Sequence, residues 1–127
     1  MRQKQAAGEK PLFWMGSAKR DLLAFPEAVR DEIGVALSVA QFRGKHPKTK
    51  PWQGEGPGVL EVVEDHRGDT YRAVYTVRFE DAVYALHCFQ KKSHRGSKTD
   101  QRDVDLISQR LKAAQQDYEA RYGKRKK

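Results

Sequence analysis

The stretch between Val59 and Lys92 constrains the fold most strongly, because it has the pattern of three successive strands with short connections. Each segment is rich in Val, Tyr, Phe and Thr, which favour strands. The segments are Val59–Asp65, Thr70–Phe79 and Ala82–Lys92. Between them, Arg67-Gly68 and Glu80-Asp81 fit two-residue hairpin tips. Neighbouring strands joined in this way predict a three-stranded antiparallel meander.

The two tips also predict the register of the strands. If His66 faces Asp69 and Phe79 faces Ala82, each strand presents alternate residues to opposite faces of the sheet. One face is expected to be a packing face, with Leu60, Val62, Ala73, Tyr75, Val77, Tyr84, Leu86 and Cys88. The other face is mixed, with Glu61, Arg72, Arg78, His87, Phe89 and Lys91 among Val59, Val63, Val74, Val83 and Ala85.

The flanking segments predict one further strand and three helices. A short apolar strand is expected at Pro11–Gly16. Ser17 can cap a short helix, and Pro26 suits the first position of a second helix that ends near Phe42. A third helix is expected from Asp100 to Gly123, capped by Asp100 or Asp103. The apolar stripes of the two longer helices are Val29, Ile33, Leu37 and Ala40, and Val104, Ile107, Leu111, Ala114 and Tyr118.

These elements predict an α+β fold with a first strand, two N-terminal helices, the meander and a C-terminal helix. The 127 residues fit a single domain over 1–127, with an ordered core at about 11–118 and polar tails. Because 25 Lys and Arg outnumber 17 Asp and Glu, the net charge of +8 favours anionic partners, nucleic acid first. Cys88 is the sole cysteine, which fits a reducing compartment. No apolar run approaches the ~20 residues of a membrane span, and no secretory segment is visible, so a cytoplasmic protein is expected.

Two regions concentrate positive charge. The loop Lys45–Gly58 interleaves cations with Trp52, an arrangement that can follow RNA phosphates and stack a base. The same Trp52 could instead anchor the loop on the core. The second region follows the last strand and contains Lys91, Lys92, His94, Arg95 and Lys98.

Several motifs resemble those of a known family. They are "FWMGSAKRDLLAFPEAVRDEIG", "GVLEVVED", "DTYRAVYTVRF", "VYALHCFQKKS" and "DLISQRLKAA". Together they resemble the RelE/ParE toxin superfamily, and within it the phage-derived HigB-like branch. The resemblance covers about Pro11 to Tyr118.

The resemblance implies a RelE-like fold and a cytoplasmic toxin of a type II toxin–antitoxin pair. Such toxins are neutralised by a helix-turn-helix antitoxin of the HigA-like or Xre type. RelE-like members cleave messenger RNA on the ribosome without a metal or another cofactor. The matching positions are Arg72 in "YRAVY" and Lys91 and Lys92 in "FQKKS". The chain departs from the family where Glu61 is followed by two valines instead of an "ELR"-like arginine, and Arg78 is the suggested substitute.

Metal-free cleavage of RNA needs a base for the ribose 2′-OH, cations around the phosphate and an acid for the leaving 5′-oxygen. Arg72 suits the phosphate, because its planar guanidinium matches phosphate oxygens. Lys91 or Lys92 can act as the base only if neighbouring cations lower its pKa from the ordinary ~10.4. His94 needs no such shift, since histidine titrates near pH ~6.5. The residues expected to bind RNA are Lys45, Lys48, Lys50, Trp52, Arg78, Arg95 and Lys98.

Each assignment has a structural alternative. Lys91 and Lys92 can form a solvated strand end, Arg72 can pair with Glu61, and His87 can be a packed, hydrogen-bonded histidine. The histidines lack the spacing of zinc ligands, so no metal site is expected. Two other functions also stay open: a ParE-like toxin that inhibits DNA gyrase without cutting RNA, and a basic module that binds RNA or the ribosome without catalysis.

Overall fold

A computed structural model describes residues 7–91 and 99–123 of the chain. Its helices and strands follow one another in nearly the predicted order, with one additional short strand. The elements are β1 (Leu12–Trp14), α1 (Ala18–Leu23), α2 (Glu27–Gln41), β2 (Thr49–Pro51), β3 (Val59–His66), β4 (Asp69–Thr76), β5 (Val83–Lys91) and α3 (Gln101–Tyr122). The strand β2 was not predicted and lies within the expected loop.

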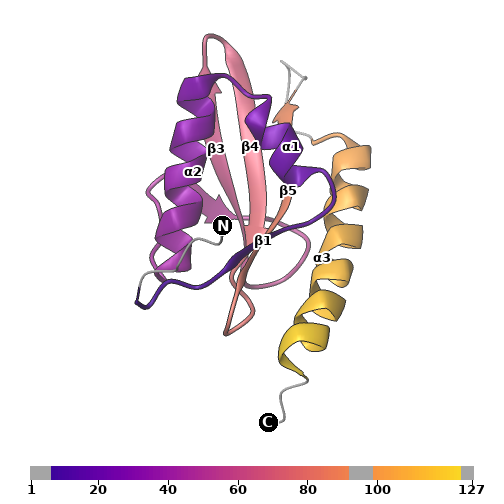
Figure 1. Cartoon of the computed structure of the whole chain (residues 1–127). Helices are drawn as coiled ribbons and strands as arrows, with labels where there is room; N and C mark the ends of the chain where they lie inside the picture. The colour runs from indigo at the N-terminus through magenta and orange to yellow at the C-terminus, as the bar shows by residue number, and fades with distance from the viewer. Residues whose placement is uncertain (1–6, 92–98, 124–127) are drawn as a thin grey trace.

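Within the described residues, the strands form one sheet in the order β1-β5-β4-β3-β2. Strand β1 runs parallel to β5, and the other neighbours are antiparallel. Figure 1 shows α1 and α2 in front of the sheet, with α3 along its right-hand side. The α+β class and the β3-β4-β5 meander are therefore confirmed.

The β3–β4 hairpin has the predicted register, with His66 paired to Asp69 and Val59 paired to Thr76. Its turn residues Arg67 and Gly68 both have positive φ, 51° and 85°. Two such residues make the type I′ turn that matches the twist of a two-residue hairpin. Local turn chemistry thus sets the alignment of the whole hairpin.

The β4–β5 connection differs from the prediction. Strand β4 ends at Thr76, so residues 77–82 form a longer connection, and Phe79 and Ala82 are not a strand pair. Near its end β5 has the expected register, in which Arg72 pairs with Phe89. The register then shifts between Val74 and Tyr75, and β5 accommodates one extra residue as a bulge.

The bulge reverses the predicted faces for the first half of β5. Tyr84 and Leu86 pack on the side of α3, not with Leu60 and Val62. Val83 belongs to the cluster under α1 and α2, and Ala85 pairs with Tyr75 of that cluster. The predicted faces of these four β5 residues were wrong, because one inserted residue exchanges the faces of all residues before it.

Both faces of the sheet are covered by helices. The front cluster buries the predicted stripe of α2 against β3 and β4. The rear cluster buries one side of α3 against β4 and β5, so the mixed face is apolar enough to hold a helix. The α3 residues buried there are Ile107, Leu111, Ala114 and Tyr118.

Polar contacts fix α3 on the sheet. At its start, the carboxylate of Asp100 accepts a 2.9 Å hydrogen bond from the backbone N–H of Arg102, which confirms the predicted cap. Farther along, the hydroxyl of Tyr84 donates to Asp117 at 2.5 Å, and that of Tyr118 donates to Asp81 at 2.6 Å. The C-terminal half of α3 is therefore held to β5 and to the β4–β5 connection by specific contacts as well as by apolar packing.

Candidate functional site

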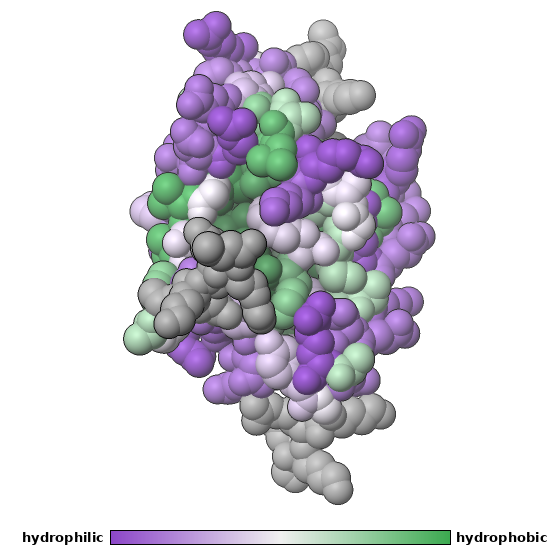
Figure 2. Space-filling model, viewed as in Figure 1, coloured by the Kyte–Doolittle hydropathy of each residue, from purple (hydrophilic) through white to green (hydrophobic). Residues whose placement is uncertain are grey.

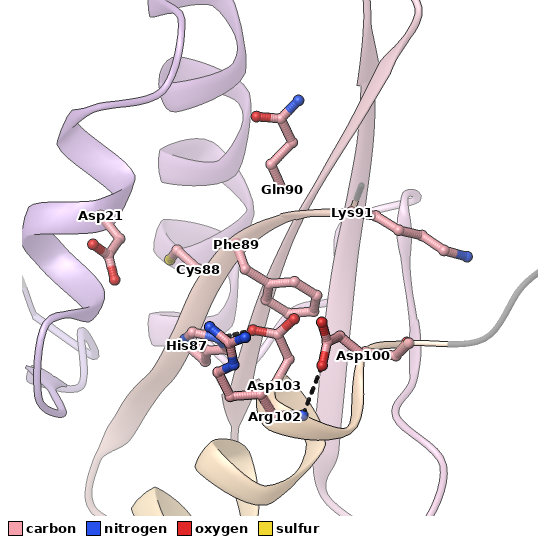
Figure 3. A pocket seen from close by; sticks show the side chains of 10 residues that line it. Asp21, His87, Cys88, Phe89, Gln90, Lys91, Asp100, Arg102 and Asp103 are labelled. Carbon is pink, nitrogen blue, oxygen red and sulfur yellow. Dashed lines mark hydrogen bonds and ion pairs between the residues drawn. The ribbon is translucent and has the colours of Figure 1, made fainter. Parts of the chain in front are cut away.

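A pocket of about 920 Å³ lies where the end of β5 meets the first turn of α3. Residues 87–91 of β5 form one wall, and Asp21 of α1 contributes to another. The α3 side supplies Thr99, Asp100, Arg102 and Asp103. Figure 3 shows Arg102 and Asp103 next to His87 and Phe89, whereas Lys91 extends away from this group. The pocket therefore has a charged inner wall and a cation at its rim.

The closest contact at this wall joins His87 and Asp103. Nε2 of His87 lies 2.7 Å from Oδ1 of Asp103. The His87 side chain is 7% exposed and that of Asp103 is 24% exposed, so the carboxylate is the more accessible partner. The imidazole also stacks on the ring of Phe89, with centroids 4.8 Å apart. Packing on Phe89 holds the histidine ring in one plane.

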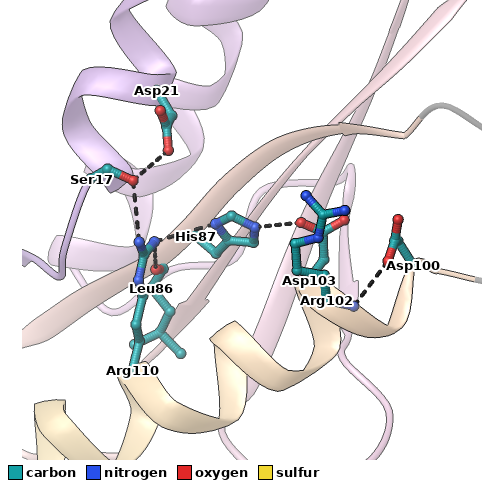
Figure 4. Close-up of polar contacts among 8 residues, drawn as sticks. All are labelled: Ser17, Asp21, Leu86, His87, Asp100, Arg102, Asp103 and Arg110. Carbon is teal, nitrogen blue, oxygen red and sulfur yellow. Dashed lines mark hydrogen bonds and ion pairs between the residues drawn. The ribbon is translucent and has the colours of Figure 1, made fainter.

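Behind His87, Arg110 joins α3 to β5 and α1 (Figure 4). Its Nη1 donates to the backbone oxygen of Leu86 at 3.0 Å and lies 3.3 Å from Nδ1 of His87. Its Nη2 donates to Oγ of Ser17 at 3.1 Å, and that hydroxyl donates to Asp21 at 2.7 Å. Burial lowers the pKa of Arg110, and the charge of Asp21 opposes this shift.

The close approach of Arg110 to α1 depends on Gly16. A Cβ atom at this position would lie 2.7 Å from the guanidinium, and the residue has a φ of +53°. Both observations favour glycine, because a side chain would displace Arg110 from Ser17. The turn between β1 and α1 is thus shaped to admit this guanidinium.

The structure places the predicted catalytic residues in different settings. Lys91 lies at the rim of the pocket. Lys92, His94, Arg95 and Lys98 lie outside the described residues.

Arg72 does not line the pocket. Its Nη1 donates to Oε1 of Glu61 at 2.7 Å, and the two side chains are 13% and 7% exposed. Nε of Arg72 is buried and has no hydrogen-bond partner in the described part of the chain. The structural alternative weighed for Arg72, an ion pair with Glu61, is therefore present.

The predicted RNA-binding loop divides into exposed and anchored residues. Lys45 and Lys50 are exposed. Lys48 contacts Glu64 at 2.8 Å, and this hydrogen bond raises the pKa of its ammonium group. Trp52 is 7% exposed and packs in the rear cluster, which favours its role as a core anchor. Arg78 donates to the backbone oxygens of Glu55 and Pro57 at 2.6 and 3.0 Å and so secures residues 55–57.

The surface is mainly hydrophilic along α3 and at the tip of the β3–β4 hairpin (Figure 2). Apolar residues reach the surface in the seam between α1 and α2 in the same view. None of the helices in residues 7–91 and 99–123 combines the length and the apolar character of a membrane span. The same residues contain no group of three or more His, Cys, Asp or Glu side chains suited to a metal ion.

Sequence reasoning did not identify the Arg110–His87–Asp103 arrangement. His87 was interpreted as a packed histidine, and Asp103 as an alternative helix cap. Asp103 is 16 residues from His87 in the chain, and Arg110 is 23 residues away. The available signal was a histidine on the mixed face of β5 and two polar residues on the helix expected to cover it.

Comparisons with known proteins agree with this fold. Residues 20–112 match the family model "Phage derived protein Gp49-like (DUF891)". No curated protein shows significant sequence similarity to the chain. A mutant of the E. coli toxin RelE in the free state is similar in structure over 83% of this chain and 97% of that chain, with 16% identity and a TM-score of 0.51. The toxin–antitoxin complex RelBE2 from Mycobacterium tuberculosis contains a chain that matches over 71% of this chain and 100% of its own length, with 20% identity and a TM-score of 0.46.

The family match spans most of the chain, from α1 to the middle of α3. The likeness to RelE confirms the RelE-like fold that the sequence motifs predicted. The chain therefore belongs to the phage-derived Gp49-like family, and its fold is RelE-like.

Proposed function

We propose that the chain is the toxin of a type II toxin–antitoxin pair and that it cuts messenger RNA on the ribosome without a metal ion. The family and the RelE-like fold support the toxin assignment. The net charge of +8 supports an anionic target. The expected neutralising partner is a helix-turn-helix antitoxin of the HigA-like or Xre type.

The observation that carries the nuclease proposal is the charged wall of the pocket between β5 and α3. Arg102 and Asp103, neighbours in the chain, both line the pocket and lie next to His87 (Figure 3). Cleavage of RNA by its own 2′-OH requires a cation at the phosphate and a base at the hydroxyl. A volume of about 920 Å³ is in the range of small-molecule sites and admits a nucleotide.

In this proposal Arg102 makes the first phosphate contact, because its side chain is exposed at the pocket. Lys91 binds a neighbouring phosphate at the rim. Arg72 can take the phosphate role predicted from the sequence only after Glu61 releases it. Lys92, His94, Arg95 and Lys98 follow Lys91 directly in the chain and are proposed to extend the site. Exposed Lys45 and Lys50 form a second, separate contact with RNA.

The proposal is tested with purified protein, ribosomes and a defined messenger RNA, and by mapping RNA 5′ ends after induced expression. We expect cuts that appear only when ribosomes are present. Arg102→Ala and Lys91→Ala should each lower the cleavage rate by about tenfold or more, because each removes a cation from the phosphates. Lys112→Ala is the matched control, since Lys112 is exposed on α3 and does not line this pocket.

Two results would replace the proposal with an alternative. Growth arrest with intact RNA and broken DNA would favour a gyrase inhibitor. Salt-sensitive binding to ribosomes without growth arrest or cleavage would favour a non-catalytic module, because phosphate contacts weaken as salt rises.

A further inference from the structure

We infer that Asp103 is the catalytic base of the proposed ribonuclease, and that His87 and Arg110 position its carboxylate. The inference rests on the proposed function and adds the group that accepts the proton. It differs from the sequence-based expectation, which assigned this role to Lys91, Lys92 or His94. Lys91 extends away from the pocket wall on which Asp103 lies (Figure 3).

The partners of His87 define its tautomer. Arginine has only donors, so the Nη1 of Arg110 that lies 3.3 Å from Nδ1 requires an unprotonated acceptor there. The ring proton is then on Nε2, which donates to Oδ1 of Asp103 at 2.7 Å. A proton on Nδ1 would point at the guanidinium. His87 therefore acts as a fixed donor to Asp103, and both of its nitrogens are already used.

Both side chains line the pocket, but the carboxylate is the more accessible of the two. The His87 side chain is 7% exposed, whereas that of Asp103 is 24% exposed. The contact with His87 uses Oδ1 and leaves Oδ2 outside that hydrogen bond. Among the described residues, the other charged side chains that line the pocket are Arg102, Lys91, Asp21 and Asp100. Asp100 is bonded to the N–H of Arg102 and Asp21 to Ser17, so these two carboxylates have structural partners.

The chemistry is an intramolecular transesterification. Asp103 accepts the proton of a ribose 2′-OH, and the 2′-oxygen forms a bond to the adjacent phosphorus. The bond from phosphorus to the 5′-oxygen breaks, and that oxygen takes a proton from water. The products are a 2′,3′-cyclic phosphate and a 5′-hydroxyl, and Asp103 then returns its proton to solvent. Arg102 beside Asp103 stabilises the charge on the phosphate during these steps.

The competing explanation is structural. Asp103 lies in the first turn of α3, where a negative charge is favourable, and its contact with His87 also fixes the helix to β5. Asparagine at position 103 separates the two explanations, because its amide oxygen can still accept from His87 but cannot act as a base. Glutamine at position 87 distinguishes Asp103 from His87 as the base, because its amide can donate to Asp103 and accept from Arg110 but does not titrate between pH 5 and 9.

The test measures ribosome-dependent cleavage by folded variants at pH 5–9. We expect Asp103→Asn to lower the rate at least 100-fold, the scale of a lost general base. His87→Gln should stay within about threefold of the wild type, while His87→Ala and Arg110→Met lose tenfold or more. Asp105→Asn is the matched control, because Asp105 is exposed on the same helix and contacts Gln101 instead. Circular dichroism and thermal unfolding verify that each variant is folded.

Nitrogen-15 spectra of the histidine rings in the wild type and in Arg110→Met provide a measurement independent of activity. We expect protonated Nε2 and unprotonated Nδ1 for His87 in the wild type, and loss of this single tautomer in Arg110→Met. An active wild type with an equally active Asp103→Asn variant overturns this inference and leaves the proposed function standing. A loss of cleavage in His87→Gln equal to that in His87→Ala assigns the proton transfer to His87 and also overturns it. A wild type that cuts no RNA overturns both proposals.

Discussion

Arg72 donates from Nη1 to Oε1 of Glu61 at 2.7 Å, and both side chains are largely buried between β4 and β3. Arg72→Ala should therefore destabilise the fold by about 3–5 kcal/mol, since it leaves a buried carboxylate without its partner. The double variant Arg72→Met with Glu61→Leu should recover most of this loss. Urea unfolding measures the free energy of unfolding of the wild type, of Arg72→Ala and of the double variant.

This result decides how a loss of activity in Arg72→Ala is interpreted. If the double variant folds well and still cleaves RNA, Arg72 is structural. If it folds well and is inactive, the phosphate role predicted from the sequence gains support. If Arg72→Ala were as stable as the wild type, the stabilising role of the buried ion pair would be contradicted.

Trp52 secures the loop before β3 by packing in the rear cluster. Trp52→Ala should cost about 3–5 kcal/mol of unfolding free energy, the scale of a large aromatic removed from a core. Lys50→Ala, an exposed neighbour, should change it by less than about 0.5 kcal/mol. Trp52→Phe should preserve RNA binding in a filter or fluorescence assay. Loss of RNA binding in Trp52→Phe without loss of stability would instead indicate that the indole stacks on a base.

Asp117 makes a pH-dependent contribution to the anchoring of α3. The hydrogen bond from Tyr84, and secondarily the one from Arg121, lower the pKa of its carboxyl below the ordinary 3.8. Because the folded pKa is the lower one, the stabilisation is complete above the unfolded value and is lost as pH falls through the folded value. Asp117→Asn should thus be less stable than the wild type at pH 7, and the difference should disappear in stronger acid.

The expected difference is under about 1 kcal/mol, since the Asp117 side chain is 35% exposed and solvent screens its charge. Urea midpoints between pH 2 and pH 7 measure it. Tyr84→Phe removes the main donor and should reduce the same pH dependence. A gap between Asp117→Asn and wild type that widens in acid would contradict the assignment.

Cys88 should be inert to thiol reagents in the native state. The residue is 2% exposed, and burial together with the charge of Asp21 raises the pKa of its thiol to about 12. Because the thiolate is the reactive form, labelling at pH 8 should require opening of the structure. We expect complete reaction in concentrated urea and a rate at least ~1000-fold slower in buffer, in line with the rarity of unfolding. Rapid labelling in buffer would show that the adjacent pocket admits reagents to β5.

The parts of the fold that depend on local chemistry were predictable from the sequence. Gly68 and its neighbour form a turn whose geometry requires positive φ, so the β3–β4 register followed from two residues. Glu80-Asp81 has no glycine, and the real connection is longer. The bulge near Leu86 has no sequence signature, because it reflects how β5 fits both β4 and α3.

The site was predictable only in part, because some of its contacts depend on how distant elements pack together. The end of β5 and its positive charge were visible in the sequence, and Lys91 does lie at the pocket. The contact between His87 and Asp103 depends on where α3 lies on the sheet, and periodicity identifies the buried side of a helix but not its position. Strand β2 was missed because Thr49–Pro51 is short, contains proline and lies at an edge of the sheet.

The parallel pairing of Leu12 with Val83 joins the beginning of the chain to a strand made much later. During synthesis, β1 can pair with β5 only after most of the polypeptide has been made, and such distant pairings form late. The nascent chain consequently lacks the β1–β5 pairing for most of its translation.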